Sequence, residues 1–164
     1  MRIVGIDPGV MVTGYGIIEE EDKCLLPLSS GEIKTSPQHS FPKRLRKIYD
    51  HLHALIQEFR PDVMVLESIF LAKNFQVALK LGQARGMALL AAEMDGIPVE
   101  EYSPSEVKRA VVGYGAATKE QVQRMVGGIL HLKEAPTSHH AADALSVAVC
   151  HAHSAKMREM IVRR

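Results

Sequence analysis

Three carboxylates in this sequence stand at positions where they could hold a divalent metal ion. Asp7 closes the apolar run 3–6, Glu67 closes the apolar run 63–66, and Asp143 lies in a late, alanine-rich segment. Mg²⁺ prefers hard oxygen ligands and keeps several of its waters, so a few carboxylates from different elements suffice to bind it. Two such ions roughly 4 Å apart can hydrolyse a phosphodiester, because they act on both the attacking and the leaving oxygen.

The spacing of these groups predicts that they meet. Asp7 and Glu67 close two strands that lie side by side if the helix between them is an ordinary crossover. His140 and Asp143 are three residues apart and therefore share one face of a helix. Each acid alone has an ordinary explanation as a cap or a solvated charge, and Asp7 before Pro-Gly is normal turn chemistry. Glu67 is harder to explain in that way, because a buried carboxylate needs a partner.

The elements that must position these groups form one α/β domain. Apolar segments on both sides of the Pro-Gly turn predict a β-hairpin, and Pro27 in the next strand predicts an edge position or a bulge. Helical spacing and short apolar runs predict the remaining elements. In chain order we expect hairpin strands ending at 7 and over 14–18, a strand over 23–35, a helix over 41–59, a strand over 63–66, a helix over 75–94, a strand over 98–102, and helices over 104–111, from 118, and from 138 to about 155.

The helix over 75–94 is apolar on more than one face and carries the small residues Gly82 and Gly86. Such a helix is expected to be buried on two sides. One of those sides could lie against a partner subunit, or the helix could be central within a monomer. The pattern alone favours neither alternative.

Composition is that of an ordinary soluble globular protein of 164 residues, with 46% hydrophobic and 24% charged residues. No run approaches the 20 or so apolar residues that span a bilayer, and the chain enters a strand directly after Met1, so we expect neither a membrane segment nor a signal peptide. Cys24 and Cys150 are too few for a disulfide framework, which predicts free thiols in the cytoplasm. Residues 150–153 could suggest zinc, but such neighbours point around a helix rather than toward one ion.

The net charge of +1 gives no case for a polyanionic partner on its own. Positive charge is nevertheless concentrated in residues 103–133 and in a basic tail from about residue 156. Basic patches beside an acidic site suit a polyanion held near metal, although a solvated helical face explains them nearly as well.

At this point the motifs lead to a family. The chain resembles, from end to end, the RuvC-type Holliday-junction resolvases, which are ribonuclease-H-like nucleases. No single motif is decisive, but their order and spacing over the full length are highly specific. The matching segments are Gly5-Ile6-Asp7-Pro8-Gly9 with Thr13-Gly14-Tyr15-Gly16, Glu67 with Phe70-Leu71-Ala72-Lys73-Asn74, Ala78-Leu79-Lys80-Leu81-Gly82-Gln83-Ala84-Arg85-Gly86, Val107-Lys108, Val111-Val112-Gly113, Gln121-Val122-Gln123, and His140-Ala141-Ala142-Asp143-Ala144-Leu145.

The resemblance implies a fold and an activity. The fold is a ribonuclease-H-like five-stranded mixed sheet, three antiparallel strands followed by parallel strands, flanked by helices in a single domain over 1–164. The activity is resolution of four-way DNA junctions by paired symmetric nicks in recombination and repair. The implied cofactor is Mg²⁺, two ions per site, for which Mn²⁺ can substitute. The implied partners are a second copy of the chain and a branch-migration complex of the RuvA–RuvB type.

The resemblance carries catalytic and metal-binding roles onto Asp7, Glu67, His140 and Asp143. The fourth position departs from many members, which have Asp where this chain has His140, while others carry His. An imidazole removes one negative charge and suits Mn²⁺ better than Mg²⁺. It could ligate a metal or orient the attacking water, and the sequence leaves both open. His139 is also within helical reach of Asp143, and only the family register favours His140.

The resemblance also implies DNA contacts. Phe70 is expected to stack on or separate bases at the crossover, since every base offers a π-face, although without the family it would be taken as a core residue. Lys108 and Lys119 match basic positions near the scissile phosphate. Lys80 and Arg85 are further candidates for phosphate contacts.

Other classes of function share part of the pattern. The hairpin over 7–14 also resembles the first phosphate loop of actin-like and sugar-kinase ATPases. That fold needs a duplicated domain and a second glycine-rich loop, for which the chain has no room. A module that binds junctions without cutting is disfavoured by the intact Asp7, Glu67 and Asp143. A resolvase-like enzyme acting on RNA stays open, although Phe70 fits the junction-cutting family better.

Overall fold

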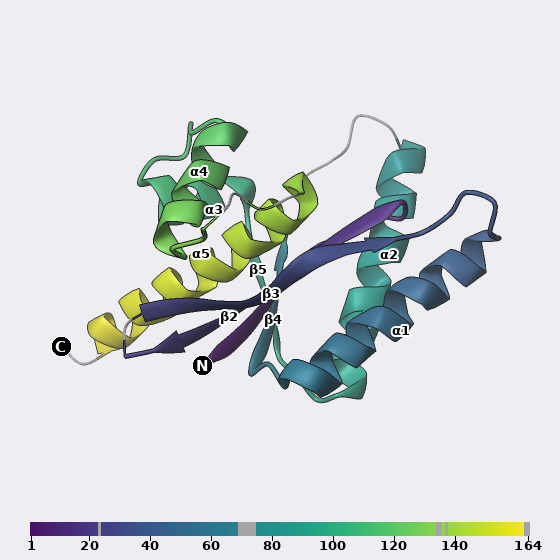
Figure 1. The fold of residues 1–164 in the computed structure, drawn as a ribbon, viewed down its shortest axis with the longest axis horizontal. Coiled ribbons are helices and arrows are strands. Elements are labelled where there is room, and N and C mark those ends of the chain that lie inside the picture. Colours follow the sequence, from purple (N-terminus) through teal and green to yellow (C-terminus); the bar gives the residue numbers. More distant parts are fainter. Residues whose placement is uncertain (23, 69–74, 134–135, 137, 163–164) are drawn as a thin grey trace.

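A computed structural model describes residues 1–22, 24–68, 75–133, 136 and 138–162, with the backbone alone for 156–162. One five-stranded sheet runs through the middle of the molecule, with helices on both of its faces (Figure 1). In chain order the elements are β1 (Arg2–Asp7), β2 (Val12–Glu21), β3 (Cys24–Lys34), α1 (Phe41–Phe59), β4 (Val63–Glu67), α2 (Phe75–Met94), β5 (Val99–Tyr102), α3 (Pro104–Val112), α4 (Lys119–Ile129) and α5 (His139–Val162).

The strand order is β3-β2-β1-β4-β5, with β1, β2 and β3 antiparallel and β4 and β5 parallel to β1. This confirms the predicted mixed sheet. The expectation from Pro27 is confirmed in both of its forms. The proline lies on an edge strand, and the β2–β3 register shifts where Ile17 pairs with Ser29 and Ile18 pairs with Pro27, so that Leu28 bulges out. An edge position suits proline because it has no N–H to donate to a ladder.

Alternation along the strands creates two cores. Residues such as Ile3 and Val65 point to the face covered by α3, α4 and α5, whereas Val4 and Leu66 point to the face covered by α1 and α2. Figure 1 shows these two helical layers on opposite sides of the sheet. Each fully buried aliphatic side chain contributes about 1.5–3 kcal/mol relative to exposure, so both layers hold the sheet in place.

Capping boxes begin the two short helices that follow β5. Ser103 Oγ accepts from Glu106 N at 3.3 Å, and the Glu106 carboxylate accepts from Ser103 N at 2.7 Å. Thr118 and Gln121 make the same reciprocal pair at the start of α4, as predicted. Each such cap is worth about 1 kcal/mol. The caps thereby fix where α3 and α4, and the lysines on them, begin.

One helix boundary needs correction. The last helix was expected to end near Ala155, but α5 continues to Val162, because residues 156–162 are mostly strong helix formers such as Lys, Met, Arg and Glu. Within this chain α2 is buried on one side only, and that side is lined by alanines. Large apolar side chains on α2 stay exposed, among them Phe75, Leu79, Leu89, Leu90 and Met94. For α2 the structure excludes the alternative of a helix central within a monomer, while a partner subunit on its second side stays a prediction.

Of the two cysteines, Cys24 is exposed and Cys150 is buried, and both are free thiols. Burial raises the pKa of the Cys150 thiol to about 11. Within the described ranges, none of the helices combines the length and apolar character that crossing a bilayer demands.

Candidate active site

Asp7 and Glu67 end neighbouring parallel strands. The β1–β4 ladder pairs Ile6 with Leu66, so the two acids that follow lie next to each other at the carboxyl ends of these strands. Alternation places both on the face that α5 covers, because Gly5 and Val65, two residues earlier, lie on that face. The predicted juxtaposition of Asp7 and Glu67 is therefore present. Carboxyl ends of strands are the ordinary ligand edge of an open α/β sheet.

Glycines beneath α5 let that helix approach the sheet backbone. A Cβ added to Gly5 would lie 2.0 Å from Ala144 O, and one added to Gly14 would lie 2.1 Å from His140 O. A Cβ on Gly16 would meet the Leu145 side chain at 2.7 Å. Real Cβ atoms do not approach so closely, so only glycine fits at these three positions. The glycines are therefore the reason that the start of α5 lies directly over the ends of β1 and β2.

The start of α5 is held by Ser138. Its hydroxyl accepts hydrogen bonds from His140 N at 3.1 Å and Ala141 N at 3.3 Å, and it donates to the Glu32 carboxylate on β3. An N-cap of this kind satisfies amides that have no partner within the helix. The cap fixes where the helix begins, and the next residues on that turn reach the strand ends.

His140 contacts Asp7 directly. Its Nδ1 lies 2.7 Å from Asp7 Oδ2. His139 points elsewhere, with Nδ1 against the Gln123 side chain at 3.0 Å. Of the two histidines that the sequence left as alternatives, His140 is thus the one that the fold brings to the acidic edge.

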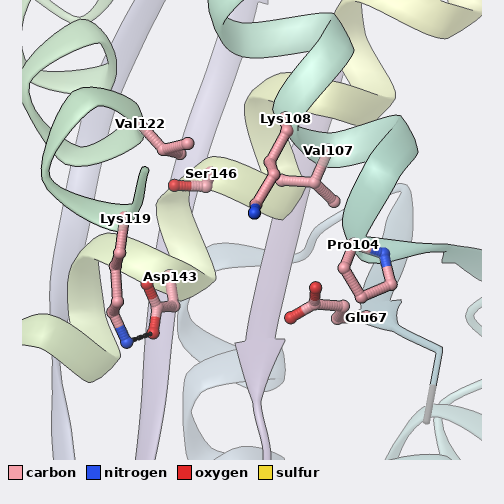
Figure 2. Close-up of a pocket in the computed structure, with 8 residues that line it drawn as sticks. All are labelled: Glu67, Pro104, Val107, Lys108, Lys119, Val122, Asp143 and Ser146. Atoms are coloured by element: carbon pink, nitrogen blue, oxygen red, sulfur yellow. Dashed lines mark hydrogen bonds and ion pairs between the residues drawn. The ribbon is translucent and has the colours of Figure 1, made fainter. Parts of the chain in front are cut away.

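Asp143 lies one turn further along α5 and pairs with Lys119. Lys119 Nζ is 2.5 Å from Asp143 Oδ2 (Figure 2). Both residues line a cavity of about 270 Å³ together with Glu67 and Lys108. Figure 2 shows Glu67 on one side of this cavity, with Lys119 and Asp143 on the other. The apolar part of its wall comes from Pro104, Val107 and Val122.

The carboxylates repel one another. Burial raises the pKa of Asp7; the hydrogen bond from His140 opposes that rise, and the negative charge of Asp143 adds to it. Burial also raises the pKa of Glu67, and the charges of Asp7 and Asp143 raise it further, against Lys119 and Lys108. Groups perturbed by both burial and like charge concentrate at functional sites. A divalent cation bound between Asp7, Glu67 and the charge of Asp143 would favour the ionised forms of Asp7 and Glu67.

The donor set fits a hard divalent cation, although the side chains are not yet gathered around a single point. Among the described residues, no three acidic, histidine or cysteine side chains already surround one metal position. Asp143 is engaged by Lys119, and that contact would have to open, whereas the His140 contact takes up only Oδ2 of Asp7. Carboxylate oxygens with one imidazole are the ligands that Mg²⁺ or Mn²⁺ accepts.

The other predicted residues divide into four groups. Lys108 and Lys119 lie at the cavity, and Lys80 is exposed on α2. Arg85 is only 8% exposed, which does not fit its expected role as a phosphate contact. Arg85 lies on the buried side of α2. Phe70 lies outside the described residues.

The rejection of a zinc site at residues 150–153 agrees with the contacts of its histidines. His151 Nδ1 lies 3.0 Å from the Tyr102 hydroxyl, and His153 Nδ1 lies 2.9 Å from the carbonyl oxygen of Ala110. These partners lie on different elements, so the two rings point apart.

Sequence reasoning missed two positioning features. It treated Gly14 and Gly16 only as part of a hairpin motif, although glycines two apart in a strand share one face and could have indicated a closely packed helix. It also placed the helix start at Ser138 without finding the contact between Ser138 and Glu32, which anchors the start of α5. Ser138 before the alanine-rich segment was a visible N-cap signal, whereas its pairing with Glu32 depends on tertiary structure.

A mixed five-stranded sheet with acids at the ends of its adjacent central strands, and further polar groups supplied by a helix over that edge, defines a nuclease of the ribonuclease-H-like class. Comparison with known proteins narrows this class. The family model described as crossover junction endodeoxyribonuclease RuvC matches residues 3–151. The RuvC of Geobacter sulfurreducens is 53% identical over 161 residues, which cover 98% of each chain. The chain belongs to the RuvC family of crossover junction endodeoxyribonucleases.

Solved structures agree with this assignment. Thermus thermophilus RuvC in complex with a Holliday junction substrate has a TM-score of 0.92 and 40% identity, and 96% of each chain is covered. The yeast mitochondrial Holliday junction resolvase Ydc2 is only 14% identical, with a TM-score of 0.68 over 96% of this chain and 80% of that one. At that identity, the likeness to Ydc2 shows the fold alone.

Proposed function

We propose that this protein resolves four-way DNA junctions by nicking two opposed strands symmetrically, as a homodimer dependent on Mg²⁺. Membership of the RuvC family and the likeness to the T. thermophilus RuvC–junction complex support this substrate. The observation that carries the proposal is the convergence of Asp7, Glu67, His140 and Asp143 at one edge of the sheet.

Asp7, Glu67 and Asp143 are proposed to hold two Mg²⁺ ions, with His140 at the margin of the set, and Mn²⁺ is expected to substitute. The bound ions supply charge neutralisation and water activation for phosphodiester hydrolysis. The raised pKa values of Asp7 and Glu67 support this role, because a cation offsets the burial and the like-charge repulsion that disfavour their ionised forms.

His140 is proposed to handle the proton of the attacking water. When Nδ1–H donates to Asp7 Oδ2, across the 2.7 Å contact, Nε2 carries the free lone pair. That nitrogen can accept a proton from water, and Asp7 holds the ring in the required tautomer and orientation. This proposal selects water positioning over direct metal ligation for His140.

Lys119 and Lys108 are proposed to bind the scissile phosphate. Both line the cavity beside Glu67 and Asp143. Lys119 must leave Asp143 when the acid takes up metal, and its ammonium group is then available for a phosphate oxygen. Lys80, exposed on α2, is proposed as a more distant backbone contact, and Phe70 remains a predicted base-stacking residue.

A second copy of the chain is proposed to pack on α2. Opposite the alanine-lined side, an apolar stripe recurs at helical spacing and includes Phe75, Leu79 and Leu89, of which Phe75 is 75% exposed. Gly82 and Gly86 lie in the same stripe, and a Cβ on either would meet nothing within 4 Å in this chain. Small residues flanked by large apolar ones allow two helices to approach closely. A two-fold dimer would present two sites to a two-fold junction.

We further propose that a branch-migration complex of the RuvA–RuvB type delivers the junction. Membership of the RuvC family is the support for this partner. Direct addition of such a complex to the cleavage reaction would measure the effect.

The test is cleavage of a labelled synthetic four-way junction in Mg²⁺, with linear duplex as the control substrate and Asp7→Asn as the control variant. Paired symmetric nicks by the wild type alone are expected. Tight junction binding without cutting, in either Mg²⁺ or Mn²⁺, would contradict the nuclease proposal and indicate a binding module. Equal cutting of the linear duplex would contradict the selectivity for junctions.

A further inference from the structure

Arg85 is a buried cation whose placement the proposed chemistry does not explain. It lies on α2 and is 8% exposed, and the part of the chain that the structure describes contains no other buried Arg, Lys, Asp or Glu. Burying a charge costs free energy unless it is paired and hydrogen-bonded. The partners of this guanidinium therefore show what the burial accomplishes.

Those partners join three elements at the catalytic edge. Arg85 Nη1 donates to the backbone carbonyl oxygen of Glu67 at 3.0 Å, and Nη2 forms an ion pair with the Glu101 carboxylate on β5. Glu101 pairs with Leu66 in the β4–β5 ladder, so both contacts act at the end of β4. Arg85 thus connects α2, the last residue of β4 and the adjacent strand.

At the end of β4, the carbonyl oxygen of Glu67 has no backbone donor on β1. The ladder between β1 and β4 stops at the pair Ile6–Leu66, and Asp7 is followed by Pro8, which has no N–H to donate. The carbonyl oxygen of Glu67 instead accepts from the arginine.

We propose that Arg85 is a positioning residue, which holds the Glu67 backbone so that the Glu67 carboxylate is presented to the metal site. The inference rests on the proposed metal role of Glu67. The contact acts on the backbone, whereas the cations that lower the pKa of the Glu67 carboxyl are Lys119 and Lys108. Groups that orient a metal ligand in this way typically change metal affinity or activity by 10–100-fold when mutated.

The direction in which metal affinity changes on loss of the Arg85 charge distinguishes positioning from a simple electrostatic effect. Removing a positive charge near a cation site would by itself strengthen cation binding, because one repulsive interaction is lost. If Arg85 positions Glu67, its removal weakens cation binding instead. A loss of metal affinity in Arg85→Met therefore cannot be a simple electrostatic effect.

The experiment measures Mn²⁺ binding to the DNA-free full-length protein by electron paramagnetic resonance, and metal-free junction affinity in parallel. Arg85→Met is expected to weaken Mn²⁺ binding about 10–100-fold, and Arg85→Lys to recover part of the loss. Junction affinity without metal is expected to stay within about twofold of wild type. Lys47→Met, at an exposed position on α1 in the same helical layer, is the matched control and should keep full Mn²⁺ affinity.

Each contrary result has a distinct meaning. Unchanged Mn²⁺ affinity in Arg85→Met would overturn the positioning role while leaving the proposed function intact. Junction affinity lost to the same degree as Mn²⁺ affinity would show a DNA contact instead. If Arg85→Met does not fold, Arg85→Lys decides, and wild-type Mn²⁺ affinity in that variant would overturn the inference. Absence of Mn²⁺ binding to the wild type would instead defeat the proposed metal site itself.

Discussion

The two faces of the sheet are built on opposite packing rules. On one face, Gly5, Gly14 and Gly16 bring α5 into contact with the strand backbone, and the close approach brings His140 and Asp143 to the acidic edge. On the other face, α2 turns alanines inward and leaves large apolar side chains outside. The first face is committed to a site within the chain. The second face leaves the apolar outer side of α2 exposed to solvent, which suits contact with another molecule.

Because of this difference, the two faces should tolerate amino-acid substitutions to different degrees. Close-packed backbone contacts leave no room for an added methyl group, since protein interiors pack as densely as organic crystals. An exposed apolar stripe accepts changes of shape without loss of folding, and its substitutions act on association instead. Mutations on the two faces should therefore affect different measurements.

The largest effect is expected from Gly14→Ala. The new Cβ would lie 2.1 Å from His140 O, so α5 must shift or the strand must distort. We expect a loss of about 3 kcal/mol or more in the free energy of unfolding, together with loss of junction cleavage. Thermal unfolding and the cleavage assay measure both.

Gly127→Ala on α4 is the matched control for this change. A Cβ there meets nothing within 4 Å, so alanine should stabilise the helix by about 0.5–1 kcal/mol. If Gly14→Ala were as stable and active as Gly127→Ala, the close approach of α5 would not be what builds the site.

An intermediate effect is expected from Leu79→Lys on α2. Leu79 is 51% exposed in this chain, so a lysine should leave the folded monomer intact while placing a charge in the proposed dimer contact. We expect dissociation to monomers in analytical ultracentrifugation and the replacement of paired nicks by single nicks.

Met125→Lys, at a 43% exposed position on α4, is the control for Leu79→Lys and should remain dimeric. A dimer that survives Leu79→Lys and dissociates with Met125→Lys would move the interface to the other face of the molecule.

The smallest effect is expected in the pH dependence of folding stability, which arises from Asp7 and Glu67 under α5. The unfolded chain protonates Asp7 and Glu67 near the ordinary pKa values of 3.8 and 4.5, whereas burial raises both in the folded protein. The folded state therefore binds more protons above those ordinary values, and its stability falls as pH rises through the raised pKa values. Unfolding in EDTA between pH 4 and 8 should show this fall. The fall should be shallower in Glu67→Gln, and an identical slope in that variant would contradict the shift at Glu67.

Much of this arrangement could be predicted from local sequence. Asp7 and Glu67 follow short apolar runs that are typical of buried strands, and one crossover helix makes those strands neighbours. The capping boxes at Ser103 and Thr118 identify helix starts because their chemistry is local. The bulge and edge position of Pro27 follow from its missing N–H.

What could not be predicted depends on choices made by tertiary packing. The periodicity of α2 is apolar on several sides, so it did not decide that alanines would face inward and Leu79 outward. For the same reason, Arg85 was named as a candidate phosphate contact although it lies on the buried side. Gly14 and Gly16 are ordinary hairpin residues until a helix is placed above them. The contact between Lys119 and Asp143 also joins elements whose distance no local pattern specifies.

A titration of thermal stability with Mg²⁺ tests the central claim most directly, namely that repelling carboxylates at the strand ends form a divalent cation site. In the wild type Tm should rise with Mg²⁺ concentration, because the ion binds the folded state alone. Glu67→Gln removes one repelling charge, so it should begin with a Tm about 2–4 °C higher in EDTA and gain little from Mg²⁺. An equal rise of Tm with Mg²⁺ in both proteins, or no rise in the wild type, would contradict the account.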